Sequence, residues 1–281
     1  RGKANGALTR LAGVISSTAA HSRTPPMSTR FPQPFEPAGC DQCRNAAALG
    51  FEFTMAFQPI VDLRGGAPFA YEALVRGPAG EGAASVLAQV NDDNRYRFDQ
   101  ACRVKAIELA AGLGLATLDG TRLSINFLPN AIYRPESCIR STLEACERFG
   151  FPSQRLMFEV TEGEQVSDGE HLICIFSDYR KRGFITAIDD FGAGYAGLNL
   201  LAKFQPHVLK LDMELIRDID ANPARQAIVA GIALTAERLG ITLIGEGVET
   251  ADERDCLLDF GVRYQQGYLF ARPAVEALPA G

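Results

Sequence analysis

The chain has 281 residues, an apolar fraction of 47% and a formal net charge of −6 at pH 7. That length suits a single large domain such as an α/β barrel, and no apolar run is long enough to span a membrane. The acidic balance argues against a broad binding surface for a nucleic-acid polymer.

Residues 1–38 differ in composition from the rest, with many Ser, Thr, Ala, Pro and basic residues and no sustained periodicity. We expect a disordered tail, or sequence foreign to the protein that precedes a natural start at Met27; the short run at 11–15 is a poor signal peptide. The barrel should occupy 39–281 and open with a short cap.

Seven scattered cysteines fit a reducing cytoplasm, and Cys40 and Cys43 are interpreted as free thiols, with a metal or redox role as the alternative.

Strand and helix signals alternate from Phe53 onward. Apolar strand-like runs cover 55–61, 69–76, 123–129, 156–162, 184–188, 207–212, 241–249 and 264–270. Helical spacing of apolar residues covers 83–115, with a break near 91–94, and predicts three later helices stopped by Gly150, Gly183 and Gly240. This alternation predicts an α/β fold with a parallel sheet, and about eight strands suggest a TIM-like (β/α)8 barrel, although periodicity alone leaves an open doubly wound sheet as an alternative.

Polar side chains recur near the ends of these runs. They are Glu72, Asn126, Glu159, Glu162, Lys210, Asp212, Glu246 and Glu249. A single one could be a satisfied core residue, but ionisable groups on buried strands are costly, so a whole series implies a shared polar site. In a parallel barrel that site lies at the carboxyl ends of the strands.

Asp189 and Asp190 stand between a short apolar run and the glycine-rich turn that begins at Gly192. Neighbouring side chains on a strand point to opposite faces, so both acids can serve one site only if the chain turns there. Placed at a strand end, they could bind two divalent cations that clamp a phosphodiester for in-line attack. A solvated Asp-Asp turn is the alternative for this motif taken alone.

The motifs together resemble the EAL-domain cyclic di-GMP phosphodiesterases. The similar segments run from about Phe53 to Pro273, in the order of that family: E-A-L-V-R (72–76), N-F-L-P-N (126–130), E-V-T-E (159–162), D-D-F-G-A-G-Y (189–195), K-L-D (210–212), G-E-G-V-E-T (245–250) and Q-G-Y-L-F (266–270). The resemblance implies a barrel whose first strand is antiparallel to the others. It also implies hydrolysis of cyclic di-GMP to linear pGpG with two cations, Mg²⁺ or Mn²⁺, in a homodimer.

The resemblance also implies a role for each matched residue. The metal ligands would be Glu72, Asn126, Glu159, Asp189, Asp190 and Glu246, with Asp189 bridging the two cations. Catalysis would rest on Lys210, Glu246 and Glu72, with Lys210 facing the nucleophilic water. A lysine among bound metal ions should have a lowered pKa; a structural salt bridge is the alternative role for Lys210. Substrate contacts would come from Gln58, Leu74, Arg76, Asp212 and Gln266, while Glu162 and Glu249 support the Asp-Asp loop.

The loop after the paired aspartates departs from the commonest family pattern. Ala193 replaces a more usual threonine, and Ala196 and Gly197 replace a pair of serines. In the family these hydroxyl side chains help to brace the loop. We therefore expect weaker coupling between dimer contacts and metal binding, with catalysis retained.

The alternative functions are a catalytically silent cyclic di-GMP receptor and a barrel phosphodiesterase with another substrate. No sensor segment is evident, so regulation is expected from the cap, a partner or transcription.

Overall fold

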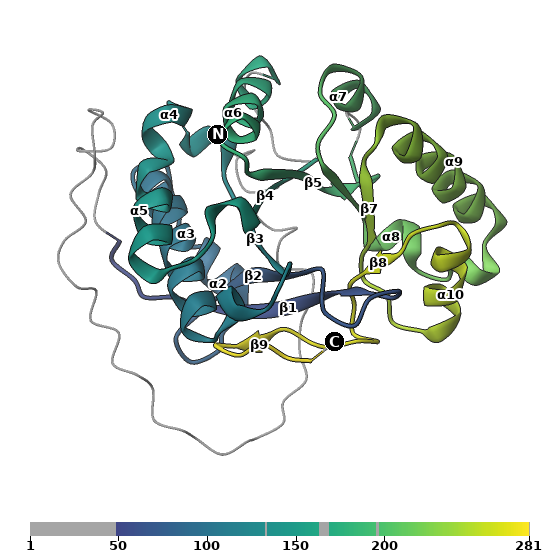
Figure 1. Ribbon diagram of the computed structural model, residues 1–281, viewed down its shortest axis with the longest axis horizontal. Helices are drawn as coiled ribbons and strands as arrows, with labels where there is room; N and C mark the ends of the chain where they lie inside the picture. Colours follow the sequence, from purple (N-terminus) through teal and green to yellow (C-terminus); the bar gives the residue numbers. More distant parts are fainter. Residues whose placement is uncertain (1–48, 133, 163–168, 195–196, 281) are drawn as a thin grey trace.

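The computed structural model describes residues 49–280 except 133, 163–168 and 195–196. The expected tail, Met27, Cys40, Cys43 and Ala196 lie outside the described residues. The described part forms a barrel wrapped by helices (Figure 1). Its strands are β1 (Thr54–Asp62), β2 (Ala70–Arg76), β3 (Arg122–Asn126), β4 (Leu156–Thr161), β5 (Ile185–Phe191), β6 (Val208–Leu211), β7 (Thr242–Gly245) and β8 (Tyr264–Gln265).

The barrel closes through its first strand. β2 to β8 pair in parallel in chain order, and β1 pairs antiparallel with both β2 and β8. This confirms the predicted barrel with an antiparallel first strand and excludes the open doubly wound sheet. The run at 264–270 was predicted to be strand-like throughout, but its strand stops at Gln265, and the chain then turns back toward the site.

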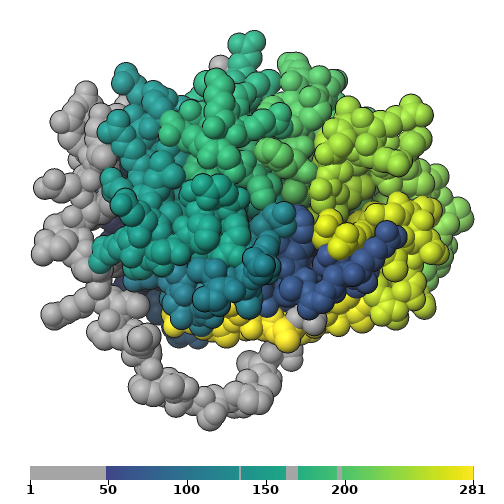
Figure 2. Space-filling view, viewed as in Figure 1, coloured from purple at the N-terminus to yellow at the C-terminus, as the bar shows by residue number. Residues whose placement is uncertain are grey.

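A ninth short strand, β9 (Ala274–Val275), pairs antiparallel with β1 outside the barrel. The hydroxyl of Tyr71 donates to the Pro279 carbonyl at 2.8 Å and ties the C-terminal segment to β2. In the space-filling view this yellow segment borders β1 along the lower face (Figure 2). The C-terminal segment thus covers the β1–β2 pair.

The helices lie outside the barrel. They are α2 (Ala83–Leu87), α3 (Arg95–Gly112), α4 (Pro135–Cys138), α5 (Arg140–Phe149), α6 (Gly169–Lys181), α7 (Gly197–Lys203), α8 (Met213–Ile216), α9 (Pro223–Leu239) and α10 (Ala251–Asp259), with 3₁₀ turns at Leu115–Thr117, Pro129–Ala131, Ser153–Arg155 and Ile219–Ala221. The predicted break between α2 and α3 is present. Gly150 and Gly240 cap α5 and α9 at φ 69°, a left-handed conformation that glycine adopts without a Cβ clash. Among the described helices, none is long and apolar enough to cross a bilayer.

The barrel interior is divided into an apolar and a polar half. A compact apolar cluster fills the end at which the parallel strands begin, and its buried members are Ile60, Ala70, Met157, Ala187, Val208 and Ile244. Two residues further along several of these strands, the same inward face carries polar groups such as Glu72, Glu159 and Lys210. The strand period of two therefore places the polar side chains above an apolar floor, at the carboxyl end of the barrel.

Candidate active site

Lys210 lies at the centre of a cluster of carboxylates. Its side chain is fully buried on β6, and Nζ lies within 3.4 Å of oxygens from four acidic residues. The distances are 3.4 Å to Glu72 Oε2, 3.3 Å to Glu159 Oε2, 3.0 Å to Asp189 Oδ1 and 2.7 Å to Glu246 Oε1. Groups far apart in the sequence, on β2, β4, β5 and just after β7, thus converge on one ammonium group.

The buried charges shift one another's protonation. Burial alone would lower the pKa of Lys210, but Asp189, Glu159, Glu246 and Glu72 together hold that pKa well above its usual value. This direction arises because the four carboxylates outweigh the burial, whereas the lowered pKa expected of Lys210 among bound metal ions stays a prediction. Burial also raises the pKa values of Glu159 and Glu246 well above the ordinary carboxyl value.

The paired aspartates reach one site because the chain turns at the second. The pairing of β5 with β6 shifts register between Ile188 and Phe191, and Asp190 has φ 53°. A left-handed conformation is strained for a residue other than glycine and is concentrated at functional sites. The turn expected from the sequence is therefore present. Burial, followed by the charge of Asp189, raises the pKa of Asp190 to about 7.

Two groups of carboxylates could each hold a cation, and Asp189 belongs to both. Glu72, Glu159 and Asp189 form one group, and Asp189, Asp190 and Glu246 form the other; within each group the ligand atoms lie within 4.8 Å of one another. Oxygen-only ligands suit hard cations such as Mg²⁺ or Mn²⁺ better than zinc. The donor set therefore fits two divalent cations that share one carboxylate.

Asn126 lies beside the first of these groups, at the end of β3. Its Nδ2 donates to Glu72 Oε1 and to Glu159 Oε1, both at 3.1 Å. The amide therefore bridges two of the expected ligands and keeps their carboxylates together. Ligation of a cation would use the amide oxygen, since only that atom carries a free lone pair.

Two amide side chains form the wall on the β1 and β8 side. Gln266 Nε2 donates to Glu72 Oε2 at 2.7 Å and to Gln58 Oε1 at 3.0 Å. Gln58 in turn donates from Nε2 to the Ala271 carbonyl at 3.0 Å. Both amides are thus ordered by their partners, and Gln266 contacts Glu72, one of the expected cation ligands.

Three further predicted substrate contacts have different surroundings. Arg76 is half-buried at the end of β2, where burial lowers its pKa and Nη1 donates to the Val75 carbonyl at 2.7 Å. Leu74 lines a pocket at the same strand end. Asp212 follows the end of β6 and caps α8, with Oδ1 accepting from the Glu214 amide at 2.8 Å.

The two residues expected to support the Asp-Asp loop have different contacts. Glu162 Oε2 accepts from the amides of Gly192 at 2.8 Å and Gly194 at 3.3 Å, so it braces the loop after Asp190. Gly192 has φ 102°, and a Cβ there would collide with a leucine of α8. Glu249 is exposed and accepts a hydrogen bond from Arg217 Nη2 at 3.0 Å, and its supporting role stays a prediction.

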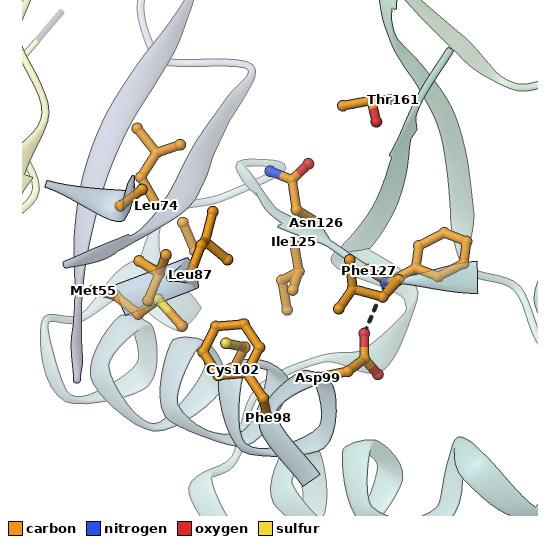
Figure 3. A pocket seen from close by; sticks show the side chains of 14 residues that line it. Met55, Leu74, Leu87, Phe98, Asp99, Cys102, Ile125, Asn126, Phe127 and Thr161 are labelled. Carbon is orange, nitrogen blue, oxygen red and sulfur yellow. Dashed lines mark hydrogen bonds between the residues drawn. The ribbon is translucent and has the colours of Figure 1, made fainter. Parts of the chain in front are cut away.

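A buried acid on α3 was missed by the sequence analysis. Asp99 is 2% exposed, and its Oδ1 accepts from the Leu128 amide at 2.9 Å (Figure 3). Asp99 also lines a pocket of about 70 Å³, together with Leu74 and Asn126. The sequence places Asp99 between Phe98 and Cys102 on an apolar helix face, which could have indicated that it is buried. An acidic residue within a helix is ordinarily interpreted as solvent-exposed, however.

The comparisons with known proteins agree with this geometry. The EAL domain family matches residues 41–273. A standalone EAL protein from Vibrio cholerae O395, solved in a c-di-GMP-bound form, is 55% identical with a TM-score of 0.79, and the likeness covers 83% of this chain and 97% of that one.

Two curated relatives point in different functional directions. The blue light- and temperature-regulated antirepressor BluF of Escherichia coli is 30% identical over 85% of this chain and 58% of its own length. The cyclic di-GMP phosphodiesterase RocR of Pseudomonas aeruginosa is 37% identical over 46% of this chain and 33% of its own. The chain therefore spans less than two thirds of either relative. Because the family matches most of its residues, the chain belongs to the EAL-domain family.

Proposed function

We propose that this chain hydrolyses cyclic di-GMP to linear pGpG with two divalent cations, Mg²⁺ or Mn²⁺, and so lowers the level of a bacterial second messenger. The observation that carries the proposal is the pair of carboxylate groups that share Asp189 around the buried Lys210. The matched ligand positions are all intact. Likeness to a named cyclic di-GMP phosphodiesterase and to a c-di-GMP-bound EAL structure supports the substrate.

The side chains of the site divide the work. Bound cations would activate water, neutralise charge on the phosphate and assist the leaving oxygen. Glu72, Asn126, Glu159 and Asp189 would hold one cation, and Asp190 and Glu246 would join Asp189 at the other. Lys210 would orient the attacking water, since its Nζ lies 3.0 Å from Asp189 Oδ1 and 2.7 Å from Glu246 Oε1.

Substrate binding would use the rim of the barrel. The Arg76 guanidinium can make two parallel hydrogen bonds to phosphate oxygens. Gln58 and Gln266 present amides suited to guanine edges, while Leu74 offers apolar contact and Asp212 an acceptor. Because the chain's net charge of −6 repels an anionic dinucleotide, these local groups and the cations have to provide the attraction.

A regulatory receptor is the second candidate, and the likeness to the antirepressor BluF favours it. Such a receptor would bind cyclic di-GMP without cleaving it. The intact set of carboxylates favours the enzyme, because a protein that signals only by binding has no need of two cation sites.

One experiment separates the two functions. Protein stripped with EDTA is incubated with cyclic di-GMP, alone and with Mn²⁺, Mg²⁺ or Ca²⁺, and the nucleotides are separated by chromatography while binding is measured by calorimetry. The enzyme forms pGpG with Mn²⁺ or Mg²⁺ but poorly with Ca²⁺, whose larger and looser shell misplaces the water. Binding of cyclic di-GMP without pGpG formation in every metal would establish the receptor. Full turnover after stripping would show that the reaction does not require the cations.

We further propose that the protein is a cytoplasmic homodimer. The described cysteines at 102, 138, 146, 174 and 256 are free, as in a reducing compartment. Leu198 on α7 is 69% exposed and Leu239 on α9 is 42% exposed, and both line an apolar hollow between these helices. Exposed apolar surface of this kind suits an isologous contact with a second copy.

A further inference from the structure

A buried ion pair lies behind the candidate site, between the barrel and the helices. Asp99 and Arg103 are on α3, and Arg103 is fully buried with its Nη2 2.9 Å from Asp99 Oδ2. Arg103 Nη1 also donates to the Tyr179 hydroxyl on α6 at 2.7 Å. Apolar residues of similar volume often replace such a pair with no loss of stability. Stability alone therefore does not account for these charges.

The acid of the pair holds the chain where it leaves β3. Asp99 Oδ1 accepts from the Leu128 amide at 2.9 Å, two residues after Asn126 (Figure 3). The Phe127 amide donates to the Glu159 carbonyl at 3.0 Å. The two peptide units that follow Asn126 are thus fixed, one to α3 and one to β4.

The base of the pair contacts the backs of two ligand-bearing strands. The Arg103 guanidinium carbon lies 5.5 Å from the ring centroid of Phe127 and 5.2 Å from that of Phe158. These rings neighbour Asn126 and Glu159 in sequence, and side chains alternate between the two faces of a strand, so the rings point outward where the ligands point inward. Asn126 and Glu159 are themselves register partners across β3 and β4.

We propose that the Asp99–Arg103 pair is a positioning device for Asn126 and Glu159, which sets the separation of these two ligands for the first cation. The inference rests on the proposed two-cation site. Partners that orient metal ligands from behind typically change metal affinity by about 10- to 100-fold when they are removed. Asp99 and Arg103 act through the strand ends and contact neither cation nor substrate.

Two double variants separate positioning from folding. Asp99→Leu with Arg103→Met replaces the pair by apolar side chains and leaves the Leu128 amide without its acceptor. Asp99→Asn with Arg103→Gln removes both charges but keeps an oxygen for that amide. We expect the apolar pair to weaken binding of one Mn²⁺ by about 10- to 100-fold, measured by calorimetry on folded protein, and the amide pair to restore most of the affinity.

The controls keep the result interpretable. Val229→Ala opens a cavity under α9, far along the chain from β3 and β4, and should lower the melting temperature without changing Mn²⁺ affinity. If the apolar pair binds both Mn²⁺ ions as the wild type does, the proposal is overturned. If that pair does not fold, Asp99→Ala with Arg103→Met is measured instead, because it also removes the acceptor of the Leu128 amide and the guanidinium beside Phe127 and Phe158; wild-type affinity there overturns the proposal equally.

The same titrations distinguish this inference from the proposed function. Wild-type protein that binds two Mn²⁺ ions but forms no pGpG would contradict the proposed enzymatic function and would not contradict the role of Asp99 and Arg103 in positioning the ligands. Wild-type protein that binds no Mn²⁺ would end both. Loss of affinity in both double variants alike would show that the bond to the Leu128 amide is not what positions the ligand.

Discussion

Lys210 occupies the position between the two carboxylate groups, where its charge offsets their mutual repulsion. Four carboxylate oxygens lie within 3.4 Å of Nζ, the nearest being Glu246 Oε1 at 2.7 Å. The same charge opposes a cation that enters either group, because like charges in a dry cavity are weakly screened. At the scale of single residues, we therefore expect Lys210 to favour turnover and to oppose metal binding.

The first prediction concerns Lys210→Met, which keeps the length of the side chain without its charge. The variant should bind Mn²⁺ at least as tightly as the wild type and retain affinity for cyclic di-GMP, since the carboxylates stay in place. Its kcat should fall by about 10²- to 10⁴-fold, the usual effect of removing a group that positions or transfers a proton. Calorimetry beside steady-state kinetics measures both quantities, and a parallel loss of affinity and rate would indicate a binding role instead.

Glu72→Ala is the matched contrast. Glu72 belongs to the first carboxylate group and also accepts from Gln266 and Asn126. Its removal should weaken Mn²⁺ binding and lower the rate by several orders of magnitude together. An active Glu72→Ala enzyme with unchanged Mn²⁺ affinity would exclude Glu72 as a ligand.

The second prediction concerns pH. Burial and the charge of Asp189 raise the pKa of Asp190 to about 7. Below that pH the Asp190 carboxyl is mostly protonated, and a cation that binds there has to displace the proton. Mn²⁺ affinity should therefore fall as the pH drops below about 7, by about tenfold per pH unit from this carboxyl alone. Calorimetry in buffers of different ionisation enthalpy counts the protons released. Asp190→Asn should release one proton fewer, and an equal count would contradict the assignment.

At the scale of elements, periodicity located the barrel strands and the glycine-capped ends of α5 and α9, because strand and helix repeats are local properties of the chain. It gave no sign of β9, since two residues carry no period and their pairing with β1 is a tertiary contact. The candidate cation ligands were found through family motifs at strand ends. Asp99 and Arg103 were missed because charges four residues apart on a helix ordinarily form a solvated pair, and only packing shows that these two are buried.

The third prediction tests the loop between β5 and α7. Glu162→Ala leaves the amides of Gly192 and Gly194 without their carboxylate acceptor, so the loop that follows Asp190 should loosen. We expect binding of the cation held by Asp190 to weaken by about tenfold. Glu162→Gln keeps an acceptor oxygen and should behave nearly as the wild type. Mn²⁺ titrations of both variants provide the measurement, and wild-type affinity in the alanine variant would mean that Glu162 does not brace the loop.

At the scale of the whole molecule, the exposed apolar hollow between α7 and α9 lies near the loop that leads from the candidate site. α7 begins at Gly197, only a few residues after Asp190, so a contact formed on α7 can bear on the loop. A two-fold dimer through this surface would place both loops at the contact. The alanines at 193 and 196 stand where hydroxyl residues brace the loop in the family, so we expect the dimer to persist with a weaker effect on activity.

The fourth prediction tests that surface. Leu198→Asp places a charge in the hollow and should shift the protein toward monomer in light scattering across a concentration series. Leu118→Asp is the matched control, because Leu118 is also exposed, at 39%, but lies after α3 rather than on α7 or α9. A wild-type protein that is monomeric at every concentration and fully active would contradict the dimer and leave the loop as a local clamp on the cations.

The central claim is that two cations sharing Asp189 support hydrolysis of cyclic di-GMP. The most direct measurement determines bound Mn²⁺ per chain and pGpG formation in the same samples, as stripped protein is reloaded in steps. We predict two Mn²⁺ ions per chain at saturation, with turnover appearing as the second site fills. In Asp189→Asn we predict that two-ion binding and turnover are both lost. Full turnover with one Mn²⁺ ion or none bound, or an Asp189→Asn protein that still binds two, would contradict the account.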